Sequence, residues 1–324
     1  MKCLLVGGAG FLGSHLADTL LAAGHSVRIF DRPHRHRYRV FTAGEPAEWM
    51  EGDFLDREQI DQALAGCDSV VHLASTTLPR TSNANPVYDV QTNLVGTLQL
   101  LDLVRRRKIG RFVFVSSGGT VYGPPQYTPI PESHPTNPIC SYGIAKLAVE
   151  KYLHLEHHLH GLDYCILRLA NPYGERQPVA AEQGVISVFL NSALRDEDIR
   201  IWGDGSVVRD YFHVADAAAA MTRALTYGGQ HRLFNIGSGI GHSVNEIVDA
   251  IELQVGRSVR RVFMPGRAFD VPTNVLDITR AREHLGWTPG IPLTQGLSRM
   301  MRWLQDRSGY TNSNPQPLKP SSPC

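Results

Sequence analysis

Short apolar runs alternate with longer amphipathic stretches through the first half of the chain. Five runs are continuously apolar, as expected for strands buried on both faces of a sheet: residues 2–6, 25–31, 69–74, 111–117 and 164–170. Between them, apolar residues recur every three or four positions, which predicts helices at residues 11–24, 56–66, 86–108 and 141–161. This alternation predicts an α/β fold with a Rossmann-like, doubly wound parallel sheet.

After about Pro172 the predicted elements become shorter, with Gly and Pro between them. We therefore expect a first domain over residues 1–171 and a smaller mixed α/β lobe over residues 172–307. Residues 212–237 are expected to return to the first sheet and complete it. Residues 308–324 are rich in Pro, Ser and Asn and hold almost nothing to bury, which predicts a disordered tail.

Composition and charge narrow the range of partners. With 32 basic and 31 acidic residues among 324, the net charge of +1 gives no electrostatic reason to expect a nucleic-acid or membrane partner. No apolar run approaches the roughly 18 residues of a membrane span. The five cysteines are scattered and never spaced as CxxC, which argues against a disulfide framework or a thiolate metal site. These features predict a soluble, cytoplasmic protein.

The first motif with chemical meaning is "VGGAGFLG", residues 6–13. Gly7, Gly10 and Gly13 lie between a predicted strand and helix, where the backbone can approach a pyrophosphate and the helix N-terminus supplies free N–H groups. The next predicted strand ends in Asp31, whose carboxylate can accept hydrogen bonds from both hydroxyls of an adenosine ribose. We predict a dinucleotide site here, and the loop adds two further residues to it: Phe11 and Leu12.

Asp31 also bears on which dinucleotide binds. Its carboxylate would repel the 2′-phosphate of NADP, so the sequence predicts NAD. The following "RPHRHRYR" could instead pair with such a phosphate, although a solvated basic loop at the edge of the sheet is the simpler interpretation. Its arginines are Arg32, Arg35, Arg37 and Arg39.

A second motif, "SYGIAKLAVEK", places Tyr142 and Lys146 one turn apart on the same face of a predicted helix. An ammonium stabilises a nearby phenolate, so we expect Lys146 to lower the pKa of Tyr142 and make it a general base. Such pairs occur by chance in many helices. This one carries weight because it accompanies a dinucleotide motif and a strand that ends in "SSGG".

Together these segments resemble the extended short-chain dehydrogenase/reductase family, and within it the nucleotide-sugar 4-epimerases similar to UDP-glucose 4-epimerase. The resemblance covers residues 1 to about 303. It implies bound NAD, a nucleotide-sugar substrate such as a UDP-sugar, and a homodimer. Besides the two motifs above, it rests on "GDFLD", "HLAS", "SSGGTVYG", "LRLANPYG", "GDGSVVRDYFHVADAA", "FNIGSG" and "RAFDVPTNVLDITRAREHLGW".

The resemblance also implies roles for individual residues of the cofactor site. Tyr142 is the catalytic base, and Lys146 binds the nicotinamide ribose and tunes that base. The other implied NAD contacts are Asp53 and Phe54 at the adenine, Leu73, Ala74 and Ser75 near the nicotinamide-side phosphate and ribose, Asn93 facing that ribose, and Ser116 packed against the cofactor.

In the substrate site, Arg209 and Arg267 resemble the arginines that hold the diphosphate. Planar guanidiniums pair with phosphate oxygens in bidentate fashion, although an exposed surface position would explain either arginine alone. Asn171 resembles the amide that contacts the sugar or its diphosphate. Asp270, in "GRAFD", is assigned to the same site.

The turn "SSGGTVYG" departs from the family pattern. Many relatives carry a catalytic serine five residues before the last glycine, and that position is Gly118 here. We expect Ser117 to take the role, with an extra residue in the turn shifting the register. Thr120 is the alternative, and both hydroxyls are expected to contact the substrate.

The residues of this turn also help to distinguish between the reactions that members of the family catalyse. Sugar dehydratases of this family carry an Asp-Glu pair there, because elimination of water needs an acid and a base at neighbouring carbons. Their absence predicts reversible oxidation at C4 of a UDP-hexose or UDP-N-acetylhexosamine through a transient 4-keto sugar, with NAD as a bound catalyst. An NAD(P)H-dependent ketoreductase or dehydratase of the same family is the alternative, and a non-enzymatic dinucleotide sensor is a third possibility.

Asn274 bears on which nucleotide sugars the site accepts. In similar epimerases the residue at this place stands beside the sugar 2-substituent, and a tyrosine there crowds an N-acetyl group. Asn274 is smaller, and its amide could bond an acetamido carbonyl, so we expect acetamido sugars or their uronic relatives to be accepted beside UDP-glucose or UDP-galactose. A purely conformational role after Pro272 is equally compatible with the sequence.

Two further expectations concern assembly and metals. Relatives pair the long helices that are predicted to start near Pro86 and Ser141 across a two-fold axis, which predicts a homodimer. A histidine-rich stretch has spacings that a metal could use, but no carboxylate motif accompanies it, so we predict no metal. Its members are His154, His157, His158 and His160.

Overall fold

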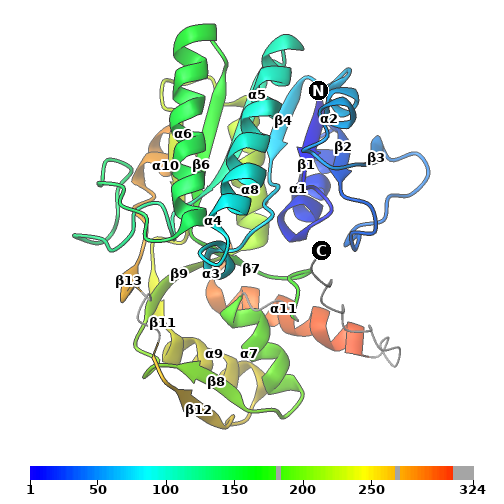
Figure 1. Cartoon of the computed structure of the whole chain (residues 1–324). Helices are drawn as coiled ribbons and strands as arrows, with labels where there is room; N and C mark the ends of the chain where they lie inside the picture. Colours follow the sequence, from blue (N-terminus) through cyan, green and yellow to red (C-terminus); the bar gives the residue numbers. More distant parts are fainter. Residues whose placement is uncertain (180–183, 267–270, 309–324) are drawn as a thin grey trace, which may run out of the picture.

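Seven strands form the central sheet of the structure. The computed structural model describes residues 1–179, 184–266 and 271–308. The strands are β1 (Lys2–Val6), β2 (Ser26–Asp31), β3 (Ala47–Glu51), β4 (Ser69–His72), β5 (Arg111–Ser117), β6 (Tyr164–Leu169) and β10 (Leu233–Ile236). They pair in the order β10-β6-β5-β4-β1-β2-β3, and every pairing is parallel (Figure 1). The predicted α/β fold and doubly wound parallel sheet are confirmed.

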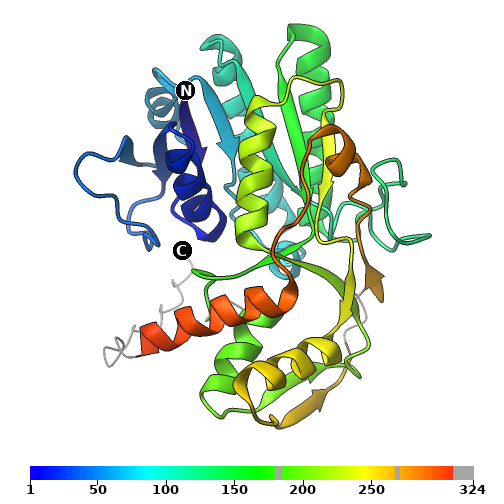
Figure 2. The same ribbon diagram turned by 180° about the vertical axis from the view of Figure 1, so that it is seen from behind.

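Helices cover both faces of this sheet and provide two hydrophobic cores (Figures 1 and 2). One face carries α2 (Arg57–Leu64), α5 (Gly96–Arg106) and α6 (Ser141–His160). The other face carries α1 (Phe11–Ala22) and α8 (Val214–Thr226). Leu100 and Leu153 are buried in the first core, and Leu16 and Met221 are buried in the second. The periodic apolar positions of the sequence thus point into the two layers between helix and sheet.

The order of strands reverses at β1. The chain runs from β1 to β2 and β3 on one side and then continues with β4 and β5 on the other. Val6, the last residue of β1, therefore lies between Phe30 of β2 and His72 of β4. Ligands of open parallel sheets bind outside the carboxyl ends of the strands at such a reversal. The glycine motif directly follows Val6, so the fold places it at this crevice.

Two features of this domain were not predicted. Strand β3, "AEWME", lies at the edge of the sheet and is half-exposed, so it has no continuous apolar run to reveal it. The single helix expected over residues 86–108 is instead three consecutive segments: α4 (Pro86–Asp89), a π-helical segment η1 (Val90–Val95) and α5. Wide π-helical turns of this kind occur often at functional sites.

The second half of the chain forms a smaller lobe around a third core. Its strands are β7 (Asn171–Tyr173), β8 (Ile199–Trp202), β9 (Val208–His213), β11 (Gly241–Ser243), β12 (Arg261–Met264) and β13 (Thr273–Asn274). Its helices are α7 (Val185–Leu194), α9 (Val244–Val255) and α11 (Leu293–Ser308). Two short helices lie outside this lobe: α10 (Thr279–His284) packs against β10, and α3 (Pro79–Ser82) precedes α4. Strand β9 pairs with β7, β11 and β13, while β8 pairs with β12. Ile199 and Ile251 belong to the core of this lobe.

The chain returns from this lobe to the first sheet through α8 and β10, and β10 pairs with β6 at the edge. The exact domain boundaries remain a prediction. The expected tail, residues 308–324, lies outside the described residues except for the end of α11. Within the described part of the chain, no helix combines the length and the apolar composition needed to cross a bilayer.

Candidate active site

A cleft opens at the carboxyl ends of β1, β2 and β4, where the strand order reverses. Asp31 lies at the end of β2, and the segment after β4 closes the opposite side of the cleft. Its lining includes the following predicted cofactor residues: Gly7, Gly10, Phe11, Leu12, Gly13, Asp31, Phe54, Leu73, Ala74 and Ser75. The structure therefore gathers ten residues from four separate sequence segments around one opening.

The glycines of this cleft leave room that side chains would fill. A Cβ at Gly13 would lie 2.4 Å from the Gly8 carbonyl oxygen, so the first turn of α1 rests directly on the glycine loop. A Cβ at Gly10 would instead meet nothing nearer than the Gly7 carbonyl oxygen at 3.7 Å. Gly10 is the N-cap of α1 and provides no side-chain cap, which leaves the N-terminal N–H groups of the helix for a ligand. These features fit the pyrophosphate of a dinucleotide.

Asp31 is held in place by the backbone around it. Its carboxylate accepts hydrogen bonds from the Ala9 N–H at 3.0 Å and from the Arg32 N–H at 2.8 Å. Arg32 and Arg35 line the cleft beside it. Arg37 instead pairs with Glu51 at 2.7 Å, outside the cleft.

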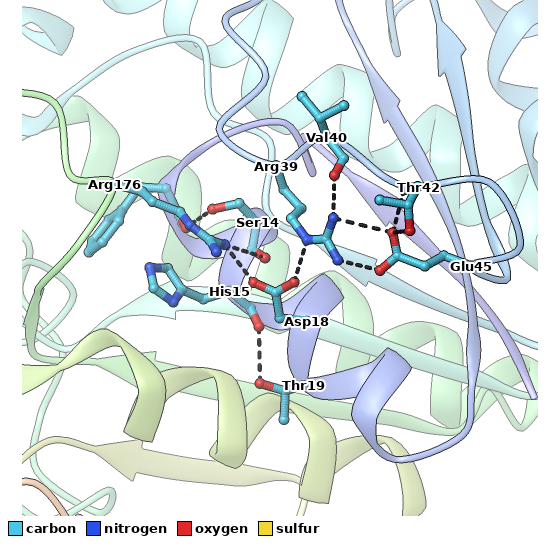
Figure 3. Close-up of polar contacts among 10 residues, drawn as sticks. Ser14, His15, Asp18, Thr19, Arg39, Val40, Thr42, Glu45 and Arg176 are labelled. Carbon is cyan, nitrogen blue, oxygen red and sulfur yellow. Dashed lines mark hydrogen bonds and ion pairs between the residues drawn. The ribbon is translucent and has the colours of Figure 1, made fainter. Parts of the chain in front are cut away.

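Arg39 belongs to a network on the outer side of α1 (Figure 3). It pairs with Asp18 at 2.6 Å and with Glu45, and Asp18 also pairs with Arg176 at 2.7 Å. Arg176 in turn donates to the Ser14 carbonyl at 3.0 Å. Asp18 thus links the basic loop after β2 to the segment after β7. Of the four arginines in that loop, Arg37 and Arg39 are occupied in ion pairs.

Two of the predicted cofactor contacts have their polar atoms engaged within the protein. The Asp53 carboxylate accepts the Leu55 N–H at 3.0 Å, while its neighbour Phe54 lines the cleft. The side-chain oxygen Oδ1 of Asn93 accepts the Thr76 N–H at 2.9 Å, and the side-chain amide nitrogen of Asn93 donates to Asp89 at 2.7 Å. Asn93 lies in the π-helical segment and so ties that segment to the loop after β4.

Tyr142 and Lys146 lie in the first two turns of α6, beside the end of β5. Lys146 donates to the Val115 carbonyl at 2.9 Å, and its Nζ lies 5.6 Å from the centre of the Tyr142 ring. Burial lowers the pKa of Lys146 to about 8, although the negative charges of Asp89 and Glu150 oppose the shift. Tyr142 and Lys146 are therefore neighbours in the structure, as the sequence predicts.

The expected lowering of the Tyr142 pKa is wrong. Burial raises the pKa of this phenol, and Cys140 and Asp89 raise it further. Lys146 is one turn away but is engaged with the β5 backbone. The spacing in the sequence revealed the neighbouring ammonium but not the burial and the Asp89 carboxylate, which raise the pKa of the phenol.

A second cavity adjoins the first and is lined by four of the nine predicted catalytic and substrate residues. Phe11, Leu12 and Ser75 line both cavities. The second is lined in addition by the following predicted residues: Ser116, Ser117, Tyr142, Asn171 and Arg209.

The strand partners of the substrate residues position them at this cavity. Asn171 of β7 donates to the Asp210 carbonyl at 3.0 Å. Arg209 of β9 donates to the Val208 and Val271 carbonyls at 2.9 and 2.6 Å. Both side chains are thus anchored on the small sheet that joins the two lobes.

The hydroxyls of the glycine turn occupy different places. The Ser116 hydroxyl donates to Glu150 at 2.6 Å, within a buried ion pair between Glu150 and Arg168. Ser117 lines the cavity beside Tyr142. The Thr120 hydroxyl is buried and makes no hydrogen bond within the described structure.

Asn274 lies next to this turn on β13. It is 1% exposed, and its amide donates to the Gly118 carbonyl at 3.2 Å. Arg267 and Asp270 lie outside the described residues. In the ranges that the structure describes, no three His, Cys, Asp or Glu side chains gather as metal ligands would.

A third cavity, in the smaller lobe, was missed by sequence reasoning. It shares Val185, Arg209 and Tyr211 with the second cavity and is lined further by Trp202 and Arg80. Trp202 ends β8 and is 44% exposed, which is unusual for so large an apolar ring. The tryptophan of "IWGDGS" could have pointed to this cavity. The sequence alone does not show whether a single aromatic side chain is buried or exposed.

The sequence pattern of the NAD dependent epimerase/dehydratase family matches residues 3–237. The chain belongs to this family. It is 36% identical to UDP-glucose 4-epimerase of Mycolicibacterium smegmatis, over 95% of this chain and 100% of that protein.

Two crystal structures are similar over nearly the whole chain. UDP-glucose 4-epimerase of Thermotoga maritima with UDP-glucose has a TM-score of 0.90 and 35% identity, covering 95% of this chain and 100% of that one. UDP-glucose 4-epimerase of Thermus thermophilus with NAD has a TM-score of 0.87 and 31% identity, covering 94% and 99%. The expected family, the NAD cofactor and the class of enzyme, a nucleotide-sugar epimerase, are confirmed.

The glycine loop supplies a matched pair of variants. Gly13→Ala should destabilise the protein, because overpacking costs about 1–3 kcal/mol and the contact here is with backbone. Gly10→Ala should leave stability nearly unchanged yet weaken NAD binding, because its methyl group would occupy the space for the pyrophosphate. Thermal unfolding of the NAD-free variants and NAD titration would check both. Unchanged NAD affinity in a folded Gly10→Ala protein would contradict this placement of the cofactor.

Proposed function

We propose that this enzyme interconverts the C4 epimers of a UDP-hexose through a transient 4-keto sugar. The observation that carries the proposal is the shared wall of the cofactor cleft and the second cavity, which brings Tyr142 and Ser117 beside the place for the nicotinamide. A sugar in the second cavity can therefore meet both the base and the cofactor.

The third cavity supports a nucleotide-linked sugar. It continues from the second cavity past Arg209, so a ligand can extend from Tyr142 into the smaller lobe. A guanidinium at this junction suits a diphosphate, and the Trp202 ring suits a flat base. The relative from Thermotoga maritima was crystallised with UDP-glucose, which favours uridine as the base.

Tyr142 and Ser117 would handle the proton of the sugar. Tyr142 removes the proton of the 4-hydroxyl and returns it when the ketone is reduced, while Ser117 donates a hydrogen bond to the same oxygen. Lys146 supplies a positive charge one turn along α6. Bound NAD supplies the two-electron acceptor and then the donor. For inversion, the 4-keto sugar must present its opposite face between the two steps.

The turn after β5 argues against elimination of water. Gly119 and Thr120 stand where a dehydratase of this family carries its two carboxyl groups, and neither residue can supply an acid or a carboxylate base. A ketoreductase of the same family remains the second candidate, because it would use the same tyrosine and lysine.

The direct test is NMR of UDP-glucose and UDP-galactose with the purified enzyme and no added cofactor. We expect each sugar to convert to the other, whereas a ketoreductase would need added NAD(P)H. Tyr142→Phe should bind NAD normally and lose about 10²- to 10⁴-fold in turnover. No conversion of either sugar by wild-type enzyme that contains NAD would overturn the proposal.

The same assay separates the two hydroxyls of the turn. Ser117→Ala should lose more activity than Thr120→Ala, because Ser117 lines the second cavity, whereas the Thr120 hydroxyl is buried and Thr120 is not among the residues that line it. A larger loss for Thr120→Ala would move the role to that residue.

We also propose a homodimer formed through α6 and the neighbouring α4 and η1. Four apolar residues of α6 are exposed by 39–59% and fall on one stripe of the helix: Ile144, Tyr152, Leu155 and Leu159. Val87 and Tyr88 of α4 are also exposed, and α4 and η1 pack against α6. A partner of the same kind would cover this combined surface with two-fold symmetry.

Light scattering at micromolar concentration should give the mass of a dimer. Replacing Leu155 and Leu159 together by Lys should yield a monomer, since charges on the stripe would be buried in the interface. Leu253→Lys is the control, because Leu253 lies on α9 in the smaller lobe and is 82% exposed. A monomeric wild-type protein would refute the proposed assembly.

Asn274 supports acceptance of a sugar with a 2-acetamido group. Its amide nitrogen is engaged with Gly118, while its carbonyl oxygen is buried without a hydrogen-bond partner in the described structure. That oxygen could accept from an acetamido N–H, which differs from the carbonyl contact expected from the sequence. We propose that UDP-N-acetylhexosamines are substrates besides UDP-glucose and UDP-galactose.

Asn274→Tyr should reduce conversion of UDP-N-acetylglucosamine more than that of UDP-glucose, because the larger ring would take the space of the acetamido group. The ratio of kcat/KM for the two sugars is the measurement. NAD content and Tm would verify that the variant folds, since the position is buried. Equal losses for both sugars would show that Asn274 does not select between them.

A further inference from the structure

Asp89 is a fully buried carboxylate that the proposed mechanism does not use. It ends α4 and has no exposed surface. It accepts hydrogen bonds from the Ser141 hydroxyl at 2.6 Å, from the Asn93 amide at 2.7 Å and from the Thr77 hydroxyl. Three donors from three segments therefore converge on one buried carboxylate. Their hydrogen bonds offset part of the free-energy cost of removing this charge from water.

One of these donors lies directly before Tyr142, at the start of α6. Cys140, the N-cap of this helix, makes no side-chain cap. Instead the Ser141 N–H donates to the Asn83 side chain at 2.8 Å, and the Tyr142 N–H donates to the Ser82 hydroxyl at 3.1 Å. The first turn of α6 is thus held by the segment that contains α3 and α4, and Asp89 is the charged member of that set.

Asp89 also faces the predicted catalytic pair. One small cavity is lined by Asp89, Asn93, Tyr142 and Lys146, and it shares Tyr142 with the second cavity. Asp89 is the only carboxylate among its described lining residues. A carboxylate at the N-terminus of α6 also interacts favourably with the helix dipole.

Two of the other titratable groups near Lys146 are neutral, and the third, Glu150, is a carboxylate that also pairs with an arginine. Burial lowers the pKa of His72, on β4, to about 3, which keeps its ring neutral. Burial raises the pKa of the Cys140 thiol, which also stays neutral. Glu150, one turn beyond Lys146 on α6, is paired with Arg168 of β6. These groups, with Tyr142 itself, complete the surroundings of Lys146 in the described structure.

We infer that Asp89 is a positioning residue, which orients Tyr142 through Ser141 and serves as the counter-charge of the Lys146 ammonium. The inference rests on the proposed role of Tyr142 as the base. In this arrangement the segment after β4 sets both the place of the phenol and the charge balance around it, although no part of Asp89 touches the substrate.

The negative charge of Asp89 acts in the same direction on the pKa of Tyr142 and on that of Lys146. Burial lowers the pKa of Lys146 and raises that of Tyr142, while the Asp89 charge raises both. Removing this charge should therefore lower both pKa values. In a pH profile of kcat, the limb that requires phenolate and the limb that requires ammonium should both move to lower pH.

Asp89→Asn keeps the shape of the side chain and removes its charge, and Ser141→Ala keeps the charge and removes one hydrogen bond. For Asp89→Asn we expect both limbs of the kcat profile to move to lower pH, so that activity falls above the wild-type optimum and rises below it. For Ser141→Ala we expect a lower kcat with unchanged KM and unmoved limbs. If Asp89→Asn lost activity equally at every pH and kept the wild-type pH profile, the proposed role of Asp89 as the counter-charge of Lys146 would be refuted.

A readout without turnover separates this inference from the proposed function. Ultraviolet difference titration of the NAD-bound enzyme reports phenolate, and subtraction of the Tyr142→Phe spectrum isolates Tyr142. That titration should move to lower pH in Asp89→Asn even if no UDP-sugar is converted; an unmoved titration would refute the inference. If Asp89→Asn fails to fold, Ser141→Ala decides the matter, because wild-type kcat in that variant would overturn the positioning role.

Discussion

The close approach of backbone to backbone at the end of β1 is the constraint on which the site depends. Gly13 can rest on the backbone of Gly8 only because Gly13 has no side chain, and this contact sets where α1 begins. With α1 in that place, its N-terminus points into the crevice made by the reversal of strand order. The cofactor cleft then shares a wall with the cavity that holds Tyr142.

The main sheet and the glycine cleft could be predicted because they depend on local and periodic signals. Continuous apolar runs indicate buried parallel strands, and a glycine motif between strand and helix indicates the turn. Strand β3 escaped prediction because it is an edge strand, half-exposed on its polar positions. The π-helical segment escaped because its residues keep helical spacing while the hydrogen bonding around Asn93 changes.

The candidate site was harder to predict where it depends on charges brought together by the fold. The sequence shows Tyr142 and Lys146 as a pair. Asp89, whose charge raises the pKa of both, lies more than fifty positions earlier, and the residues around it in the sequence do not indicate this contact. The Ser116 hydroxyl likewise donates to Glu150, thirty-four positions later, within the ion pair to Arg168. Such partners depend on tertiary contacts, which spacing along the chain does not report.

The capping of α6 by Ser82 and Asn83 has a consequence for how the protein folds. The contacts span sequence separations of 58 and 60 residues, so the start of this helix is completed only when distant segments have met. Loop closure of this length is costly before the contacts form, and non-local contacts are generally made late. The first turn of α6 is therefore fixed by tertiary contacts, so Tyr142 reaches its place only when the segment that contains α3 has docked against this helix.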